Sequence, residues 1–253
     1  MLDDRKSREK MLQDARFKIN DGARGVERMY AITDASHGYF KRRILELARG
    51  KRVLEFGCGN GANALALCPA AKAVSGIDIS EVAVQIGTEK AKEAGISNVD
   101  FFAMDAENLQ FPDDSFDMIC GVGILHHLDL QRAYSELART VGPGGHAIFI
   151  EPLGYNPFIN LFRRLTPAIR TPDEHPFLEH DLKLARTFFH KVDLRFYYLT
   201  TLMVAPFARS SVGRYAVNLG NSIDKALFAL IPPLRKYAWF VVIEMSDPIK
   251  HKA

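Results

Sequence analysis

The chain divides by its hydrophobic pattern into an N-terminal part with helical periodicity and a longer part in which short apolar runs alternate with amphipathic stretches. In residues 1–50, apolar side chains fall among charged ones, with breaks at Gly22, Gly25 and Gly38, and this pattern predicts two or three helices. From Arg52 onward the alternation is typical of βαβ units and a mostly parallel sheet. The pattern therefore predicts an α/β fold.

Seven strands and four helices follow from this alternation. The predicted strands are Val53–Phe56, Ala73–Ile77, Val99–Ala103, Phe116–Cys120, Ala147–Ile150, Val192–Tyr198 and Trp239–Glu244. The predicted helices are Gly61–Leu67, Glu81–Ala94, Leu130–Thr140 and Glu179–Phe189. Right-handed crossovers between parallel strands are expected.

Two stretches do not fit the alternation of predicted strands and helices. Residues 153–176 are rich in proline and arginine, and residues 200–236 are apolar with interspersed cations. Both are interpreted as substrate lids. We expect a single domain over residues 1–253, with residues 1–50 as an N-terminal helical lid and residues 51–152 as a cofactor-binding core.

Composition narrows the classes of partner. The 253 residues are 47% hydrophobic and 25% charged, as in ordinary globular proteins. The 33 basic and 30 acidic residues give a net charge of +3 and are spread along the chain, so no nucleic-acid partner is expected. Cys58, Cys68 and Cys120 lack the CxxC spacing of a zinc or redox site, which predicts reduced thiols and no metal site.

The N-terminal sequence and the apolar runs bear on location. The first ten residues are charged throughout and carry no apolar signal-peptide core, which predicts a cytoplasmic protein. The longest uncharged runs, such as residues 196–208, are shorter than the roughly 18 residues that a transmembrane helix needs. No transmembrane helix is expected.

The strongest chemical signal is the segment Val53–Gly61, in which an apolar strand leads into alternating glycines that open a helix. Gly57, Gly59 and Gly61 let a ligand approach the backbone, and the start of the helix offers N–H groups, including that of Asn60, to a carboxylate. The segment predicts a cofactor site at the end of the first strand.

The glycines alone do not identify the cofactor. Gly57, Gly59 and Ala62 also satisfy the looser dinucleotide pattern GxGxxA, and Asp78 lies at the expected distance of about 20 residues. Glu55 favours a different ligand, because a carboxylate at the strand end repels a pyrophosphate but attracts an ammonium group. The charge pattern favours S-adenosylmethionine over a dinucleotide.

Carboxylates also follow the next two strands. Asp78 stands at a strand tip where it can accept both ribose hydroxyls, and Ile79 is then placed to pack on adenine. Asp105 can accept the adenine amino proton, with Met104 on the face of the ring. Three consecutive strand tips therefore each carry a carboxylate.

These motifs, together with residues 111–117, 125–128 and 137–145, closely resemble those of class I S-adenosylmethionine-dependent methyltransferases, most of all the ubiquinone and menaquinone biosynthesis type. The resemblance covers roughly residues 50–155. It implies a Rossmann-like three-layer sandwich with a seven-stranded, mostly parallel sheet of order 3-2-1-4-5-7-6 and helical lid segments.

The resemblance also implies a set of cofactor contacts in this chain. They are Glu55, Gly57, Gly59, Asn60, Gly61, Asp78, Ile79, Met104, Asp105, Ala106, Gly121, Val122 and Gly123. Ala62 departs from the family pattern, because members often carry Thr or Ser there, and this puts a side-chain contact at that position in doubt.

Methyl transfer needs alignment, desolvation and, for some acceptors, removal of a proton. His126 and His127 follow the fourth strand, and a near-neutral imidazole can serve as the base. For His127 a packing role is favoured, whereas for His126 both interpretations stay open. Glu174 and His175 lie in the first lid, either in a solvated loop held by ion pairs or reaching over the methyl donor.

The segments outside the core bear on the acceptor. Aromatic residues at Tyr30, Tyr39 and Phe40 either cover the donor or belong to the core. The apolar residues of 200–236 either wall an apolar pocket or rest on a membrane surface. The sequence therefore predicts a small apolar acceptor, possible peripheral membrane contact, and an oligomeric state that it does not define.

Three rival functions remain open. A dinucleotide-dependent oxidoreductase shares the glycine loop, and a noncatalytic cofactor-binding module shares the fold. Methylation of RNA or protein is disfavoured because the chain lacks a basic stripe.

Overall fold

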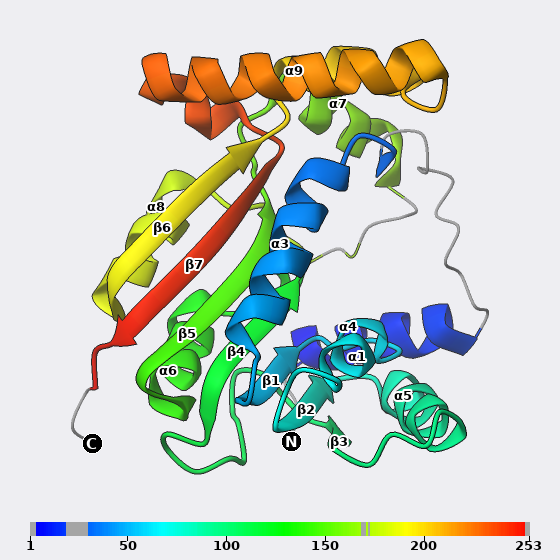
Figure 1. Ribbon diagram of the computed structural model, residues 1–253, viewed down its shortest axis with the longest axis vertical. Coiled ribbons are helices and arrows are strands. Elements are labelled where there is room, and N and C mark those ends of the chain that lie inside the picture. The colour runs from blue at the N-terminus through cyan, green and yellow to red at the C-terminus, as the bar shows by residue number, and fades with distance from the viewer. Residues whose placement is uncertain (1–3, 19–29, 168–170, 172, 251–253) are drawn as a thin grey trace.

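The computed structural model describes residues 4–18, 30–167, 171 and 173–250. A seven-stranded sheet of order β3-β2-β1-β4-β5-β7-β6 forms its centre (Figure 1). The strands are β1 (Arg52–Phe56), β2 (Ala73–Asp78), β3 (Val99–Ala103), β4 (Phe116–Val122), β5 (Val141–Pro152), β6 (Phe189–Tyr197) and β7 (Phe240–Pro248). β7 runs antiparallel to both neighbours and the other pairs are parallel, so the predicted order is confirmed.

Helices cover both faces of the sheet. The helices are α1 (Asp4–Lys18), α3 (Asp34–Leu47), α4 (Ala62–Leu67), α5 (Glu81–Glu93), α6 (Leu130–Thr140), α7 (Pro157–Leu165), α8 (Glu179–Leu184) and α9 (Ser211–Leu230). Short 3-10 helices are η1 (Leu125–His127), η3 (Ala185–Thr187), η4 (Thr200–Phe207) and η5 (Pro232–Tyr237). Apolar residues of α3, α4 and α5 pack on one face and those of α6 and α8 on the other, which gives the predicted three layers.

The alternation of strand side chains separates these two cores. In β1, Val53 joins the core under α3–α5, and Leu54 joins the core under α6 and α8. Both are fully buried, as expected for a strand in the middle of a parallel sheet. Glu55 therefore points to the same face as Val53, where α4 begins.

Local capping fixes where the helices begin. The Ser80 hydroxyl accepts a hydrogen bond from the N–H of Ala83 at the start of α5, and Asp129 accepts from Arg132 at the start of α6. At α7, Asn156 caps the helix and Pro157 occupies its first turn. These caps start each helix at the carboxyl end of the preceding strand or loop.

Several boundaries differ from the sequence prediction, and two of them differ by five residues or more. The helix predicted over Glu179–Phe189 ends as a 3-10 turn at Thr187, because β6 begins at Phe189, whose side chain is fully buried in the sheet core. β5 begins at Val141 and not at Ala147, because Val141 already pairs with Phe116, and a register shift over residues 142–145 precedes the pairing of His146 with Met118. In both cases pairing within the sheet overrides the local signal.

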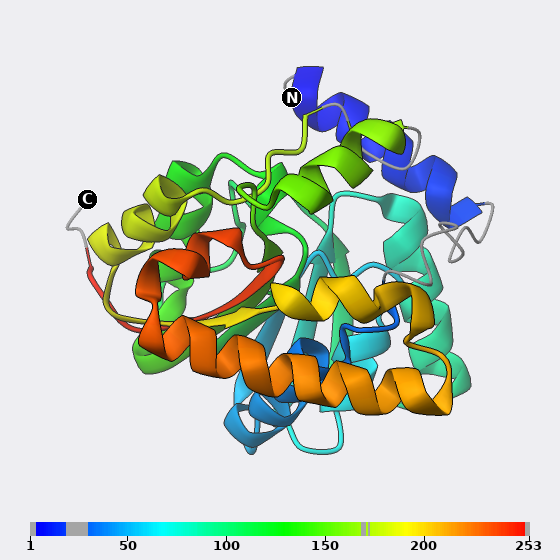
Figure 2. The ribbon, with the colours of Figure 1, turned by 90° about the horizontal axis from the view of Figure 1, so that it is seen from above.

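The second segment outside the repeat lies at one end of the molecule. α9 crosses that end, with η4 and α7 near it (Figures 1 and 2). In the described part of the chain, none of the helices combines the length and hydrophobicity needed to cross a bilayer.

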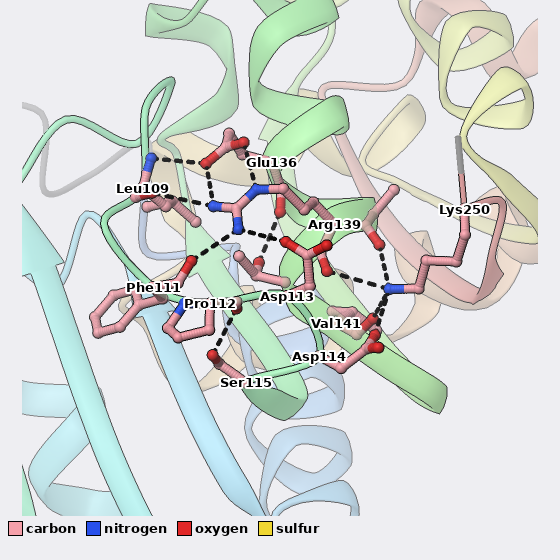
Figure 3. A network of polar contacts seen from close by, with 12 residues as sticks. Leu109, Phe111, Pro112, Asp113, Asp114, Ser115, Glu136, Arg139, Val141 and Lys250 are labelled. Atoms are coloured by element: carbon pink, nitrogen blue, oxygen red, sulfur yellow. Dashed lines mark hydrogen bonds and ion pairs between the residues drawn. The ribbon is translucent and has the colours of Figure 1, made fainter. Parts of the chain in front are cut away.

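A polar network fastens the loop after β3 to α6 (Figure 3). The Arg139 guanidinium makes two bonds to Glu136, donates to the carbonyls of Leu109 and Phe111, and pairs with Asp113 at 2.8 Å. Glu136 in turn accepts the Leu109 N–H at 2.7 Å. This network fixes the residues that directly follow the third strand tip.

Lys250 holds the other side of this loop. Its ammonium donates to the carbonyls of Ala138, Arg139 and Val141 and pairs with Asp114 at 2.6 Å (Figure 3). The lysine therefore joins the segment after β7 to the end of α6.

We expect Arg139→Leu to destabilise the fold by about 2 kcal/mol, because the change leaves two carbonyls and two carboxylates without their shared donor. Urea unfolding measures the loss. Arg132→Leu on the same helix is the control, because its 3.8 Å pair with Asp129 is exposed and should contribute less than about 0.5 kcal/mol. Equal losses for the two variants would contradict the structural role of the network.

Candidate functional site

The glycine loop joins β1 to α4 and approaches its neighbours closely. Gly57 and Gly61 adopt φ values of 62° and 79°, in the left-handed region that favours glycine. A Cβ at Gly61 would lie 2.7 Å from the Phe101 ring. The loop therefore depends on glycine both for its backbone conformation and for its packing against β3.

Glu55 lies at the end of β1, directly before this loop. The residue is 2% exposed, and its Oε1 accepts a hydrogen bond of 3.0 Å from Asn63. Its Oε2 has no hydrogen-bond partner among the described residues. Burial raises the pKa of Glu55 to about 8. The carboxyl group is therefore suited to receive a cation or another donor at its second oxygen.

Asp78 at the tip of β2 ties the glycine loop to the start of α5. Its Oδ2 accepts the N–H of Gly59 and its Oδ1 accepts the N–H of Ser80, both at 2.9 Å. Partial burial raises the pKa of Asp78, against the effect of these two hydrogen bonds. Each carboxylate oxygen keeps a lone pair for a further donor, such as a ligand hydroxyl.

The third strand tip is covered by the N-terminal helix. Lys6 of α1 pairs with Asp105 at 2.7 Å and with Glu107 at 2.8 Å. Arg5 donates to the His127 carbonyl and also pairs with Glu107. These ion pairs hold α1 against the carboxyl edge of the sheet.

A histidine and a glutamate form a buried pair beyond β4 and at the end of β5. His126 Nδ1 lies 2.7 Å from Glu151 Oε2. The other oxygen of Glu151, which is fully buried, accepts the N–H groups of Ile124 and Leu125 at 3.1 and 2.8 Å. With Nδ1 engaged by the carboxylate, Nε2 is the nitrogen that can accept a proton from a bound molecule.

These groups border one cavity of about 330 Å³, within the range of small-molecule sites. Predicted site residues that line the cavity are Gly57, Gly59, Asp78, Ile79, Met104, Asp105, Ala106, Val122, Gly123, His126 and Glu174. The structure thus brings the three strand tips and the histidine to a common space.

Four predicted contacts are not among the residues that line this cavity. Glu55 is buried behind the loop, and Gly61 packs against Phe101. The Asn60 carbonyl accepts the Lys90 ammonium at 3.4 Å. A Cβ at Gly121 would lie within 2.7 Å of the Phe149 ring, so this glycine serves packing.

The structure gives His175 a different contact from the expected one. Its ring nitrogen lies 3.4 Å from Asp181, its backbone N–H donates to the His126 carbonyl, and its side chain is not part of the cavity wall. His175 therefore supports the His126 backbone instead of reaching over a bound donor. Arg170, which belongs to the same charged loop, lies outside the described residues.

The N-terminal and C-terminal segments contribute unequally. Described residues of 200–236 do not line the cavity, so this segment does not wall the pocket as one interpretation expected. Tyr30 lines the cavity, whereas Phe40 is buried in the core and Tyr39 packs under Arg195. α1 supplies several lining residues that the sequence analysis did not name: Arg5, Lys6, Glu9, Gln13, Arg16 and Phe17.

Glu151 is the other functional residue that the sequence analysis missed. It follows the predicted strand Ala147–Ile150 directly, so the rule that singled out Glu55, Asp78 and Asp105 also applies to it. A fourth carboxylate at a strand tip was therefore visible in the sequence.

One group of side chains offers ligands for a metal ion. Nitrogen atoms of His126 and His127 and an oxygen of Glu174 lie within 4.8 Å of one another. The two imidazole rings stack, with centroids 4.1 Å apart and planes 40° apart.

Residues 53–145 match the family model of the methyltransferase domain. The chain is 38% identical over 101 residues to the uncharacterized methyltransferase YcgJ of Bacillus subtilis (strain 168), covering 40% of each protein. It is 34% identical over 113 residues to the demethylmenaquinone methyltransferase of Geobacillus kaustophilus (strain HTA426), covering 43% of this chain and 48% of that protein.

These matches have limited extent. The chain matches two fifths to one half of the length of these two relatives. A crystal structure of geranyl diphosphate C-methyltransferase from Streptomyces coelicolor A3(2) aligns with a TM-score of 0.60 at 15% identity, over 84% of this chain and 79% of that one. That likeness shows a shared fold.

The buried Glu55 carboxyl group predicts a particular dependence of stability on pH. Its pKa is about 8 in the folded protein and near 4.5 in the unfolded chain, so the folded state keeps a proton that the unfolded state loses. Stability should therefore fall as pH rises from about 4.5 to 8. We expect Glu55→Gln to remove this loss, so that the variant gains stability over the wild type between pH 5.5 and 8, measured by urea unfolding.

Asp117→Asn serves as the control for this prediction. Its hydrogen bond to Arg52 lowers the pKa of Asp117, so that carboxylate is ionised in both states across the same range. Its effect on stability should be constant from pH 5.5 to 8. A constant difference between Glu55→Gln and wild type would show that Glu55 does not titrate as described.

Proposed function

We propose that the protein transfers a methyl group from S-adenosylmethionine to a small apolar acceptor, because residues 53–145 match the family model of the methyltransferase domain and a relative of this stretch is a demethylmenaquinone methyltransferase. The observation that carries the proposal is the cavity, because the glycine loop after β1, the carboxylates of Asp78 and Asp105, and His126, which pairs with the buried Glu151, meet at it. One end has groups suited to a nucleoside, and the other has a base.

The nucleoside end is formed by β1, β2 and the loop after β3. Asp78 accepts the ribose hydroxyls, Ile79 and Met104 pack on adenine, and Asp105 accepts its amino group while keeping its bond to Lys6. The second oxygen of Glu55 is a buried acceptor that has no hydrogen-bond partner in the described part of the chain, and it fits the ammonium of the methionine moiety. Bound there, S-adenosylmethionine supplies an electrophilic methyl group with a neutral thioether as leaving group.

At the acceptor end, His126 Nε2 takes a proton from the nucleophilic group of the acceptor. Glu151 fixes the ring and stabilises the imidazolium that forms, and two backbone N–H groups hold Glu151 in place. Tyr30, Trp239 and Phe240 give this end of the cavity aromatic walls. Those walls favour an apolar acceptor and exclude water.

The relatives suggest a class of acceptor. One curated relative is a demethylmenaquinone methyltransferase, and a protein of similar fold was crystallised with geranyl diphosphate and S-adenosyl-L-homocysteine. Both names contain a prenyl-derived molecule. We therefore include prenylated quinols and terpenoids among the acceptors to be tested.

The rival functions differ in the ligand that they require. A dinucleotide oxidoreductase would require a pyrophosphate at the glycine loop. A noncatalytic module would bind the cofactor without turnover. Calorimetry with the two ligands distinguishes the first alternative, and a methyl-release assay distinguishes the second.

We expect calorimetry to show binding of S-adenosylhomocysteine and no heat with NADH or NADPH. Asp78→Asn should weaken this binding by at least about tenfold, because it replaces a charged acceptor of the ribose hydroxyls. Asp193→Asn, a change on the β6 edge strand, is the control and should bind as the wild type does. Heat with a nicotinamide dinucleotide and none with S-adenosylhomocysteine would overturn the proposal.

Glu151→Gln should lower kcat by about a hundredfold or more while binding S-adenosylhomocysteine normally. The amide keeps its oxygen for the backbone N–H groups but presents a donor to Nδ1, so His126 adopts the wrong tautomer. Methyl release from S-adenosylmethionine, measured with the acceptor panel, tests this. His146→Gln is the control, since His146 pairs with Glu244 and is not part of the cavity wall. An unchanged kcat in Glu151→Gln would remove the base from the mechanism.

A further inference from the structure

A row of apolar side chains is exposed along α9. Val212, Tyr215, Leu219, Ile223 and Leu230 are 43–80% exposed and recur three, four or seven residues apart, so they share one side of the helix. We call these five residues the outer stripe. Scattered exposed apolar residues are ordinary, but a continuous row on one helix marks an interaction surface.

The outer stripe does not arise from loose packing of the helix. A second, inner row of α9, which includes Val217, Gly220 and Phe228, is buried against the protein. Asp224 in this row accepts the N–H groups of Leu199 and Thr200 at 2.9 and 2.7 Å. α9 is therefore fastened through its inner row, and the outer stripe is a second apolar side of a fixed helix.

Neighbouring elements extend this surface. η4 exposes Met203 and Phe207, and α7 exposes Phe158, Leu161 and Leu165 on one side. Figure 1 shows α7 and α9 at the same end of the molecule, and Figure 2 shows η4 along α9 and α7 farther from it. The exposed apolar area therefore extends beyond a single helix.

The exposed charges of residues 200–237 have one sign. Within η4, α9 and η5 and the residues between them, the sole acidic residue is Asp224, which is 2% exposed and accepts hydrogen bonds from η4. Arg214, Lys225 and Arg235 in the same segment are exposed. The segment that carries the outer stripe is therefore cationic at its surface.

We propose that this surface docks on a lipid bilayer that carries anionic headgroups, with the outer stripe inserted at the boundary of headgroups and acyl chains. Apolar insertion and cations at the rim are the two contributions that bind an amphipathic helix to such a membrane. A second copy of the chain fits less well, because a twofold contact between identical surfaces would bring like charges together.

Docking in this way places the site close to the lipid. α7, whose Leu161 is exposed at this end, also supplies Arg163 to the wall of the cavity. An apolar acceptor dissolved in the bilayer would thus have a short path to the site. This consequence rests on the proposed function, whereas docking itself does not require methyl transfer.

Vesicle flotation tests the proposal with the full chain. Vesicles of phosphatidylcholine alone are compared with vesicles that contain about 30% phosphatidylglycerol, at low salt and at about 0.5 M salt. We expect binding to the anionic vesicles, at least about tenfold weaker in Leu219→Glu/Ile223→Glu. Arg214→Glu/Lys225→Glu should weaken binding to the anionic vesicles and should also reduce the loss of binding caused by salt, because the screened attraction is removed.

Matched controls carry the same changes elsewhere. Leu45→Glu on α3 and Lys183→Glu/Arg186→Glu near α8 alter exposed residues away from α9 and should bind as the wild type does. Thermal unfolding and S-adenosylhomocysteine binding establish that each variant is folded, which separates failure of docking from failure of the proposed function. Absence of binding to anionic vesicles overturns the proposal. So does equal loss in the controls, or a dimer that Leu219→Glu/Ile223→Glu dissociates.

Discussion

Carboxylates at the carboxyl edge of a parallel sheet need hydrogen-bond donors or cations beside them. The groups that supply these donors and cations determine the arrangement of much of the site. Asp78 is satisfied by the N–H groups at the glycine loop and at the start of α5, which fixes these two segments relative to each other. Asp105 is paired with Lys6, which brings α1 over the same edge. The loops and the N-terminal helix therefore take their positions from charges that the sheet presents.

The two most deeply buried carboxyl groups are compensated to different extents. Glu151 receives two backbone N–H groups and the His126 ring, so both oxygens are engaged. Glu55 receives the Asn63 amide at one oxygen, and its pKa rises to about 8. A fully engaged carboxylate orients its neighbour, whereas a partly engaged one retains the capacity to interact with a ligand cation. This difference supports the assignment of one end of the cavity to the cofactor and the other to proton transfer.

The sequence predicted the seven strands, because buried strands and amphipathic helices leave strong periodic signals. The order of the strands in the sheet came from the resemblance to the methyltransferase family. It also placed Asp78 and Asp105 correctly at strand tips. It missed the contacts of α1, because pairing of Lys6 with a residue about 100 positions away leaves no local pattern. For His175 it left two interpretations open, and the 3.4 Å contact with Asp181 agrees with the one that expected a loop held by ion pairs. The N-terminal helix and the loops thus depend on long-range contacts that periodicity does not reveal.

The cavity has one part built mostly from residues inside the family match and another built mostly from residues beyond it. The match ends at residue 145, and it contains Glu55, Asp78 and Asp105, which form the proposed nucleoside end. The proposed acceptor end takes His126 from within the match, but Glu151, Glu174 and Trp239 lie beyond it. The outer stripe of α9 also lies beyond it. Because the cofactor is common to many methyltransferases while the acceptor is not, specificity must be built by the segments outside the shared core. Under the proposed function, the elements that follow β5, and the lipid surface on which we infer they rest, would therefore determine the identity of the acceptor.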